Sequence, residues 1–573
     1  MKLRTFFSGL AAAVGGLLLI GLLSFWGLTS QNPKAFLQQN GRLAPSAAQF
    51  VPRQSPLMVS LLARPDRLWG LRQLVIAPRN RAQSRQTWQA LKQWISDYSG
   101  LDYDADLRSW LGDEITWAVT SADLDHSADN GQQPGYLLVL TSHQGLQARE
   151  AAHLFWQKRV LAGETLVFEQ VSGTTLIHNT SASTINSDTS LSESGWSESA
   201  PHQFASAVVG DQYVLLANDP QVIRQAIAAY QAPDVSLATD STYQTLLTQL
   251  PSGQIAWTYS NLEATLDWLD LRQNHNSEAA GSSSQKLFLS WQVTPQGISA
   301  DTALVAAPGR PFTPYSASDN SSIRAMDWLP PDSIVAAGSH NVTALWQSFY
   351  EGLGQYEPLQ TALSPAVKAL SLGSNIDIPD IPKLWTDAPG DSALGLLKAP
   401  SPAWVFISKS GTAGSTPEAL DRQAQQEGGL SVAPIEWDNL SITAWTRLSL
   451  RPQPLGGTPQ VNTDVVAVHT QVDHYDVFAT SLEALHQVLE ARQQKPRQSF
   501  QADLALVDTP NAGVLYLDWS QVNPLLVQRW PWLTVLNQIS QPVSDHLKTI
   551  VMRAQDSDRS AHRGQLTLTL SES

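Results

Sequence analysis

The sequence predicts an α+β fold: a tandem duplication of a mixed antiparallel-sheet and helix unit after one N-terminal transmembrane helix. Three observations lead to this prediction. An apolar run without charged residues lies near the start of the chain, and short motifs recur in the same order in its two halves. Strand-like and helix-like runs do not alternate with glycine turns, as they would in a doubly wound parallel sheet. We therefore expect two similar repeats behind one membrane segment.

The composition excludes several classes of protein. The 573 residues carry a formal net charge of −15, which argues against a nucleic-acid-binding protein, because a phosphate backbone requires a basic surface. No cysteine is present, which excludes disulfides, thiolate catalysis, cysteine-ligated metals and a lipidated cysteine anchor. With 42% hydrophobic and 15% charged residues, the chain is not a disordered polyelectrolyte.

Residues 5–29 are predicted to form a transmembrane signal-anchor. The run Phe6–Leu28 carries no charge, and a helix of this length crosses a hydrocarbon core about 30 Å thick. Lys2 and Arg4 precede the run, which places the N-terminus in the cytoplasm and the bulk of the chain on the other side. A cleaved signal peptide is the alternative, and it leaves the bulk on the same side.

The rest of the chain is predicted to hold a polar stalk and two α+β repeats. We assign residues 30–48 to the stalk, 49–307 to the first repeat, 308–322 to a linker and 323–573 to the second repeat. Phe50-Val51-Pro52 in the first repeat corresponds to Trp328-Leu329-Pro330 in the second. Asp211–Ala217 likewise corresponds to Asp473–Ala479. Because rare residues match as well as apolar ones, we interpret these motifs as a duplication.

Local signals predict the start of one helix in each repeat. Gln212–Ala217 is a short β-rich run, and the helix after it should begin at Asp219 and Pro220. An aspartate at the N-cap accepts an unpaired amide, and proline at the first helical position has no amide to leave unpaired. In the second repeat, Thr480 and Glu483 have the spacing of a capping box.

Two stretches are predicted to be loops. The segment 179–200 is rich in serine, threonine and asparagine, so we expect a disordered loop that buries little apolar surface. Arg451–Asn462 is rich in proline and glycine and stands at the equivalent place in the second repeat.

One motif carries a family resemblance. The segment Gly100–Ile115, which reads GLDYDADLRSWLGDEI, resembles a hallmark of the uncharacterised family called domain of unknown function 3352, found largely in cyanobacteria. The N-terminal anchor and the motifs at Pro52 and Pro330 are also similar to it, although Thr386-Asp387-Ala388 departs from the pattern in the second repeat. The resemblance implies no activity, cofactor or functional residue. It implies that the bulk of the chain lies in the periplasm or the thylakoid lumen.

The same acidic segment has the spacing of part of a calcium-binding loop. The acidic residues in question are Asp102, Asp104, Asp106 and Asp113. However, Leu107 stands where the sharp turn of such a loop requires glycine. We therefore expect Asp102 to cap a short helix, Leu107–Leu111, and to bind no calcium.

No catalytic, cofactor-binding or metal-ligating residue is predicted. The sequence has no HExxH pair, no GxSxG elbow, no phosphate-binding loop and no dinucleotide fingerprint. His469 and His474, with Asp473 and Asp476 nearby, are the nearest approach to a metal site. We interpret both histidines as exposed residues at a strand edge.

Tryptophan is unusually frequent, with 20 residues. Six of them occupy apolar-periodic positions and are expected in the core: Trp69, Trp110, Trp257, Trp291, Trp346 and Trp385. Trp530 and Trp532 differ, because Pro531 between them breaks the periodicity. We predict that this pair contacts a protein partner or the membrane.

These observations favour a membrane-anchored extracytoplasmic protein that binds or scaffolds other proteins and is not an enzyme. It would belong to the cell envelope or the thylakoid lumen and bind no nucleic acid or cofactor. Two alternatives remain open: an envelope-polymer hydrolase whose carboxylates meet between the repeats, and a carrier of an apolar ligand. The sequence alone does not distinguish the plasma membrane from the thylakoid membrane.

Overall fold

The computed structural model describes seventeen segments of the chain and one isolated residue, Gln89. The segments are 44–62, 102–127, 132–161, 163–179, 204–249, 254–269, 284–294, 297–315, 323–341, 390–398, 402–411, 417–426, 429–437, 440–451, 460–493, 512–529 and 547–570, with residue 89 alone between the first two. Among these residues, no helix has the length and apolarity needed to span a bilayer. The predicted anchor, residues 5–29, lies outside them.

The predicted α+β fold of two mixed repeats behind a transmembrane helix is wrong. The described residues are dominated by twenty strands with antiparallel pairing, and they contain few helices, none of them transmembrane. Strands replace part of the expected loop Arg451–Asn462, since Arg451 pairs with Gln460 at the ends of two long strands. The prolines and glycines that predict a loop here lie between the ends of the two strands, which the pairing of Arg451 with Gln460 extends into the predicted loop.

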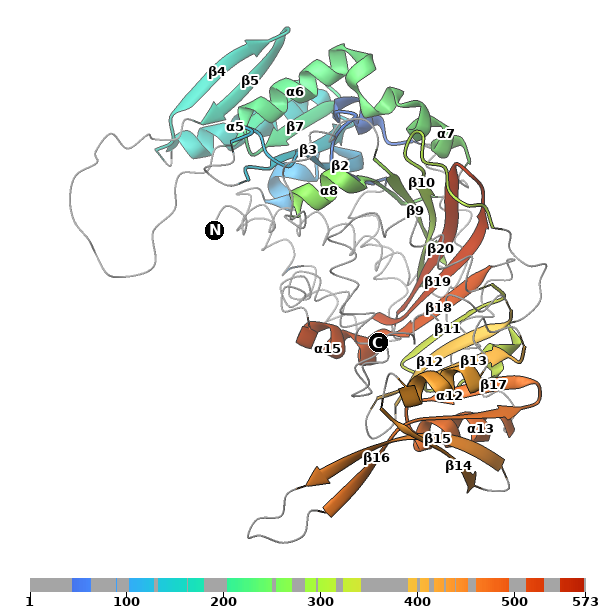
Figure 1. The fold of residues 1–573 in the computed structure, drawn as a ribbon. Helices are drawn as coiled ribbons and strands as arrows, with labels where there is room; N and C mark the ends of the chain where they lie inside the picture. Colours follow the sequence, from blue (N-terminus) through green and yellow to red (C-terminus); the bar gives the residue numbers. More distant parts are fainter. Residues whose placement is uncertain are drawn as a thin grey trace, which may run out of the picture. The chain divides into compact units, whose positions relative to one another are not determined.

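The described residues form two compact units, the first ending at Thr302 and the second beginning at Ala303. The strands of the first unit are β1 (Leu57–Leu61), β2 (Leu111–Ser121), β3 (Gly135–Ser142), β4 (Leu166–Val171), β5 (Thr174–Asn179), β6 (Ala205–Val209), β7 (Tyr213–Ala217), β8 (Ala256–Asn261), β9 (Lys286–Thr294) and β10 (Gly297–Val305), which crosses the boundary. Their pairing order is β10–β9–β8–β1–β2–β3–β7–β6–β5–β4. The hairpin of β4 and β5 ends this order and projects beyond the helices (Figure 1).

Helices α5 (Gly145–Leu161) and α6 (Pro220–Gln231) cover opposite faces of the first unit's sheet. The indole N–H of Trp156 on α5 donates to Ser206 Oγ of β6 over 2.7 Å. Arg224 of α6 donates to Glu169 of β4 over 2.7 Å. Phe168, Ile177 and Ser206 pair across three neighbouring strands, so their side chains lie on one face of the sheet. Glu169 follows Phe168 along β4, so it lies on the opposite face. Shorter helices in this unit are η1 (Ser46–Phe50), η3 (Tyr103–Leu107), η4 (Pro233–Val235), η5 (Leu237–Thr239), α7 (Ser241–Gln249) and α8 (Leu262–Trp268).

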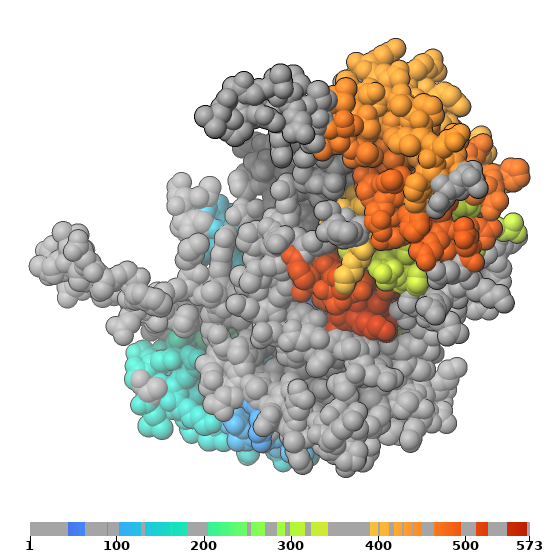
Figure 2. All heavy atoms as spheres, turned by 90° about the horizontal axis from the view of Figure 1, so that it is seen from below, coloured from blue at the N-terminus to red at the C-terminus, as the bar shows by residue number. Residues whose placement is uncertain are grey.

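The second unit pairs its strands in a corresponding order. Its strands are β11 (Val335–Ser339), β12 (Ser392–Leu397), β13 (Ala403–Lys409), β14 (Ser431–Trp437), β15 (Leu440–Arg451), β16 (Gln460–Val472), β17 (Tyr475–Ala479), β18 (Gly513–Asp518), β19 (Leu547–Ser557) and β20 (Ala561–Leu570). The order is β20–β19–β18–β11–β12–β13–β17–β16–β15–β14. Its helices are η6 (Arg324–Trp328), α12 (Pro417–Gln426), α13 (Leu482–Gln493) and α15 (Trp519–Arg529). The described residues from β12 to β17 gather as one orange-coloured block in Figure 2.

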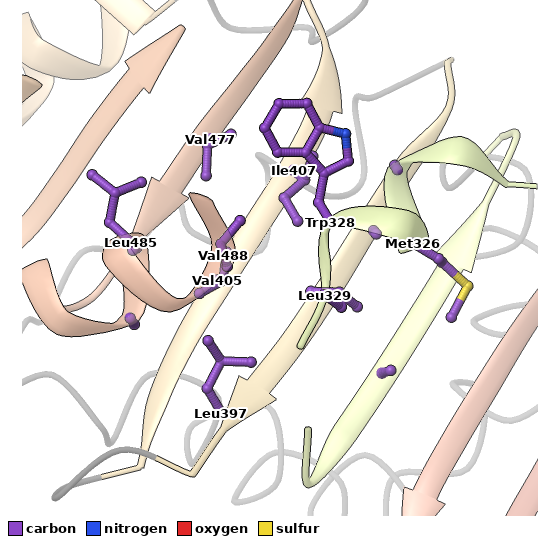
Figure 3. Packing of buried hydrophobic residues seen from close by; sticks show 14 of the residues in the cluster. Met326, Trp328, Leu329, Leu397, Val405, Ile407, Val477, Leu485 and Val488 are labelled. Atoms are coloured by element: carbon purple, nitrogen blue, oxygen red, sulfur yellow. The ribbon is translucent and has the colours of Figure 1, made fainter. Parts of the chain in front are cut away.

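One apolar core lies between η6, α13 and the second unit's sheet. Figure 3 shows Trp328, the last residue of η6, and Leu329, which follows it. Both face Val405 and Ile407 of β13, and Val488 of α13 lies beside them. The guanidinium of Arg492 lies 5.3 Å from the Trp328 ring centroid, and the Tyr475 ring lies 5.4 Å from it. Trp328 therefore joins three elements of this unit, and its indole is only 2% exposed.

The predicted start of α6 is confirmed, and that of α13 is corrected. Asp219 accepts from the Gln221 amide over 2.6 Å, and Pro220 is the first helical residue. In α13, however, Ser481 Oγ accepts from the Ala484 amide, while Thr480 Oγ1 accepts from the amide of Trp404 on β13. The Thr480 hydroxyl, expected to cap the helix, is bonded to the neighbouring strand instead, and the next residue, Ser481, is the N-cap.

The Asp102 cap is also confirmed, but the helix that follows it is not the predicted one. Asp102 Oδ1 accepts from the Ala105 amide, and the capped turn is η3 (Tyr103–Leu107). Leu111 begins β2 rather than ending a helix. Asp106 Oδ2 accepts in turn from the Asp102 amide over 2.9 Å. Both carboxylates therefore hold the turn, as the capping interpretation requires.

Candidate functional site

Asp421 and His469 of the second unit form hydrogen bonds with other residues of the same unit. In the second unit, Asp421 Oδ1 accepts from the indole N–H of Trp445 over 2.7 Å and lies 2.8 Å from His469 Nε2. The His469 ring stacks on Phe478, with centroids 4.9 Å apart. The expectation that His469 is exposed is therefore wrong, whereas His474 is exposed as predicted. Among the described residues, no group of three His, Cys, Asp or Glu residues is placed to hold a metal ion.

A second partly buried acid, Asp391, joins η6 to the sheet. Its Oδ2 accepts from the Ala325 amide over 3.1 Å and from the Tyr475 hydroxyl over 3.0 Å. Burial, together with the adjacent negative charge of Asp391, raises the pKa of Tyr475 to about 12. The phenol therefore stays protonated and remains a donor to this carboxylate at neutral pH.

An ion pair ties three segments of the first unit together at Asp240. Asp240 Oδ2 lies 3.0 Å from Lys286 Nζ and 3.7 Å from Arg53 Nε, and Oδ1 accepts from the Tyr243 amide. Burial opposes ionisation of Asp240, but the Tyr243 amide and the two cations outweigh it and lower the pKa of this carboxyl. The ion pair therefore contributes most to the stability of the fold when Asp240 is ionised.

We expect Asp240→Asn to weaken the first unit in a pH-dependent way. A carboxyl with a lowered folded-state pKa stabilises the fold above its unfolded-state value, about 3.9, and loses that contribution as pH falls through the folded-state value. The variant should thus lose roughly 1–3 kcal/mol of unfolding free energy at pH 7 and converge with the parent near pH 2. Urea unfolding at a series of pH values measures this, and a difference independent of pH would contradict it.

The outer face of α5 is the most distinctive exposed surface of the first unit. Four aliphatic side chains are exposed there: Leu146 (77%), Leu154 (53%), Val160 (48%) and Leu161 (88%). At 100° per residue they lie within an arc of about 120°. Phe155 and Trp156 point the other way and are buried against the sheet. The helix is therefore apolar on two opposite faces, although a surface helix normally needs only one. We call these four residues the α5 stripe.

Phe168 of β4 extends this apolar surface beside α5. It belongs to the cross-strand row that runs through Ile177 to Ser206, so it lies on the sheet face that α5 covers. Two strand spacings separate Phe168 from Ser206, a distance of about 10 Å. α5 does not reach that far, and the Phe168 side chain is 64% exposed.

The cations that flank the α5 stripe are neutralised within the chain. Arg149 forms an ion pair with Asp211, Lys158 lies 2.9 Å from Asp106, and Arg159 lies 3.0 Å from Glu164. Each pair joins α5 to a segment of its own unit. The stripe is thus an apolar surface without uncompensated positive charge at its margins.

The second unit shows that the fold does not require such a stripe. α12 follows β13 and precedes β14, as α5 follows β3 and precedes β4. α12 buries Leu420 and Ala424. Its exposed residues are all polar: Glu418, Arg422, Gln425 and Gln426. The apolar residues on the outside of α5 are therefore specific to that helix.

A small cavity lies beneath α5 and has a volume of about 20 Å³. It is lined by Asp106, Leu107, Trp110, Leu140, Ala151, Ala152, Phe155, Ser206, Val214 and Leu216. A space of this size holds about one water molecule. An apolar ligand of the kind expected for a carrier needs several hundred cubic ångströms, so this cavity does not accommodate one.

The family model for proteins of unknown function called DUF3352 matches residues 10–570. The chain belongs to this family. The match supports the resemblance seen at Gly100–Ile115, and the family description assigns no activity. No curated protein and no solved structure matches the chain. The α5 stripe of this DUF3352 protein is consequently interpreted from its own geometry.

The residues expected to contact a partner lie outside the described part of this DUF3352 chain. Trp530 and Trp532 follow the end of α15, so their exposure stays a prediction. The sequence signal for the α5 stripe was the recurrence of Leu146, Leu154 and Leu161 at spacings that fall on one helical face. That pattern normally marks a core face. Only the structure shows that a different face of α5 meets the sheet.

Proposed function

We propose that this DUF3352 protein is a membrane-anchored extracytoplasmic scaffold that binds another protein through the α5 stripe and is not an enzyme. One observation carries the proposal: α5 buries Phe155 and Trp156 against its own sheet and still presents four aliphatic side chains outward. Several large aliphatic side chains exposed on one helical face are typical of an interaction site. Because its margins carry no free cation, an apolar protein surface suits it better than an anionic one.

The membrane anchor and the compartment are part of the same proposal. Phe6–Leu28 has the length and apolarity of a single crossing, and Lys2 with Arg4 favours a cytoplasmic N-terminus. The bulk of the chain would then lie in the periplasm or the thylakoid lumen of a cyanobacterium. The absence of cysteine is compatible with either compartment.

We expect a charge placed in the α5 stripe to abolish partner binding without unfolding the protein. Leu154→Glu combined with Leu161→Glu would force carboxylates into an apolar contact, so cross-linked partner peptides from native membranes should fall about tenfold or more. Cross-linking with mass spectrometry on the full chain measures this. Val235→Glu is the matched control, because Val235 is similarly exposed, at 51%, but lies on η4.

The control variant should retain the parent's cross-links. Equal loss in both variants would indicate a general effect of added negative charge, and unchanged cross-links in the α5 variant would refute binding at the stripe. The melting temperature should stay within a few degrees of the parent in both variants, since all three substituted side chains are at least half-exposed.

A further inference from the structure

Two leucines of the α5 stripe are placed symmetrically about the midpoint between His153 and Leu154. Leu146 and Leu161 stand at equal distances from that point, on either side of it. If two α5 helices packed antiparallel about it, Leu146 of one copy would face Leu161 of the other, and the two Leu154 side chains would meet near the axis. A two-fold interface requires such a self-complementary surface.

Two polar residues on this face are placed symmetrically about the same point. Glu150 and Gln157 are exposed and equally far from the midpoint, so each Glu150 would face Gln157 of the other copy. A glutamine amide donates to a carboxylate, whereas two glutamates at these positions would repel each other. Arg149 and Lys158 lie on opposite margins of this face, nine residues apart, and each is already paired with an aspartate of its own chain.

We infer that the partner bound at the α5 stripe is a second copy of this chain, packed with its α5 antiparallel to the first. This inference rests on the proposed function, because it names the partner for the same surface. Antiparallel helices pack with their axes 8–10 Å apart, which lets the leucines of the two stripes interdigitate. Phe168 beside α5 adds apolar surface at the edge of the contact.

The charge arrangement favours a second copy over a lipid surface. Binding of a helix to anionic lipid depends on free lysine and arginine along its polar face. On α5 the flanking cations are paired, and the chain has a net charge of −15. The one acid on this face, Glu150, would meet Gln157 of the other copy rather than a second carboxylate, which limits the repulsion between the two faces. Copies anchored in one membrane would also meet at a high effective concentration.

The absence of cysteine from the chain permits a direct test. We would introduce Leu154→Cys alone, Leu146→Cys alone and Leu161→Cys alone into the full chain in native membranes and in neutral detergent, and oxidise each with copper phenanthroline. A disulfide requires Cα atoms about 4.4–6.8 Å apart. Leu154→Cys should therefore form a covalent dimer in high yield. The other two single variants should not, because the fifteen-residue separation keeps their own counterparts about 22 Å apart.

Mixing the Leu146→Cys and Leu161→Cys chains should restore the covalent dimer, because antiparallel packing brings these two positions together. Val235→Cys, on η4, controls for random collision and should remain monomeric. Melting temperatures would confirm that every variant is folded.

Three results would overturn the inference: equal dimer yields at all positions, dimers from Leu146→Cys alone but not from the mixture, or a monomer in every sample by light scattering and cross-linking. The last result separates the two proposals. If the Leu154→Glu and Leu161→Glu variant still lost its cross-linked peptides, a different protein would be the partner and the proposed function would stand. If dimers formed only with anionic vesicles present, the surface would be a lipid contact, and both proposals would fail.

Discussion

Trp328→Ala should lower the free energy of unfolding of the second unit by about 3–5 kcal/mol, the range for deleting a buried aromatic side chain. The indole is 2% exposed and lies at the centre of the core that joins η6, α13 and the sheet. Its removal leaves a cavity lined by Val405, Ile407 and Val488, and it also ends the contacts with Tyr475 and Arg492. Urea unfolding followed by circular dichroism measures the loss.

Trp328→Phe is the matched control for this variant. It keeps an aromatic ring against Tyr475 and removes less volume, so it should cost clearly less than Trp328→Ala. The chain has two compact units, so the unfolding of each can be followed as a separate transition. Only the transition of the second unit should shift. A loss below about 1 kcal/mol for Trp328→Ala would show that the indole is not part of the core.

Local features that depend on a few neighbouring residues were predictable from the sequence. Asp219 and Pro220 start α6 as expected, because capping chemistry acts within one turn of a helix. Trp110 and Trp257 are buried, as their apolar-periodic positions predicted. The strand at Tyr213–Ala217 was likewise foreseen from its β-rich composition.

Features decided by distant parts of the chain were not predictable. Thr480 has the spacing of a cap, yet it bonds to β13, a strand far away in the sequence. The proline- and glycine-rich segment Arg451–Asn462 predicts a loop, yet its ends belong to β15 and β16 and are paired with each other. For the same reason the sequence overestimated the helical part of the fold and gave the wrong fold class.

The α5 stripe could be predicted from the sequence only in part. The spacing of Leu146, Leu154 and Leu161 identifies a helical face, but not whether that face meets the sheet. Trp156 settles the orientation through its bond to Ser206, fifty residues away. The predicted site at Trp530 and Trp532 lies outside the described residues, so the α5 stripe neither replaces nor excludes it.

A carboxylate holds a short helix against the sheet in each of the two units. In the first unit, Glu114 of β2 accepts from the Ser46 amide over 2.9 Å and from the Ala47 amide over 2.8 Å. In the second, Asp391 accepts from the Ala325 amide. The first N–H groups of a helix have no partner inside it, so an acceptor from the sheet satisfies them and fixes the position of the helix. The fold therefore uses these acids for attachment of η1 and η6.

Glu114→Ala should consequently destabilise the first unit by about 3–5 kcal/mol. Glu114 is 1% exposed and also accepts from the hydroxyls of Ser46 and Thr116, so its removal leaves two buried amides and two hydroxyls without this partner. Each unsatisfied buried donor costs roughly 1–3 kcal/mol. Asp391→Ala removes fewer bonds at a less buried site, so it should cost less. Urea unfolding of both variants measures the order, and an Asp391→Ala effect equal to or larger than that of Glu114→Ala would contradict this account of how the sheet holds η1.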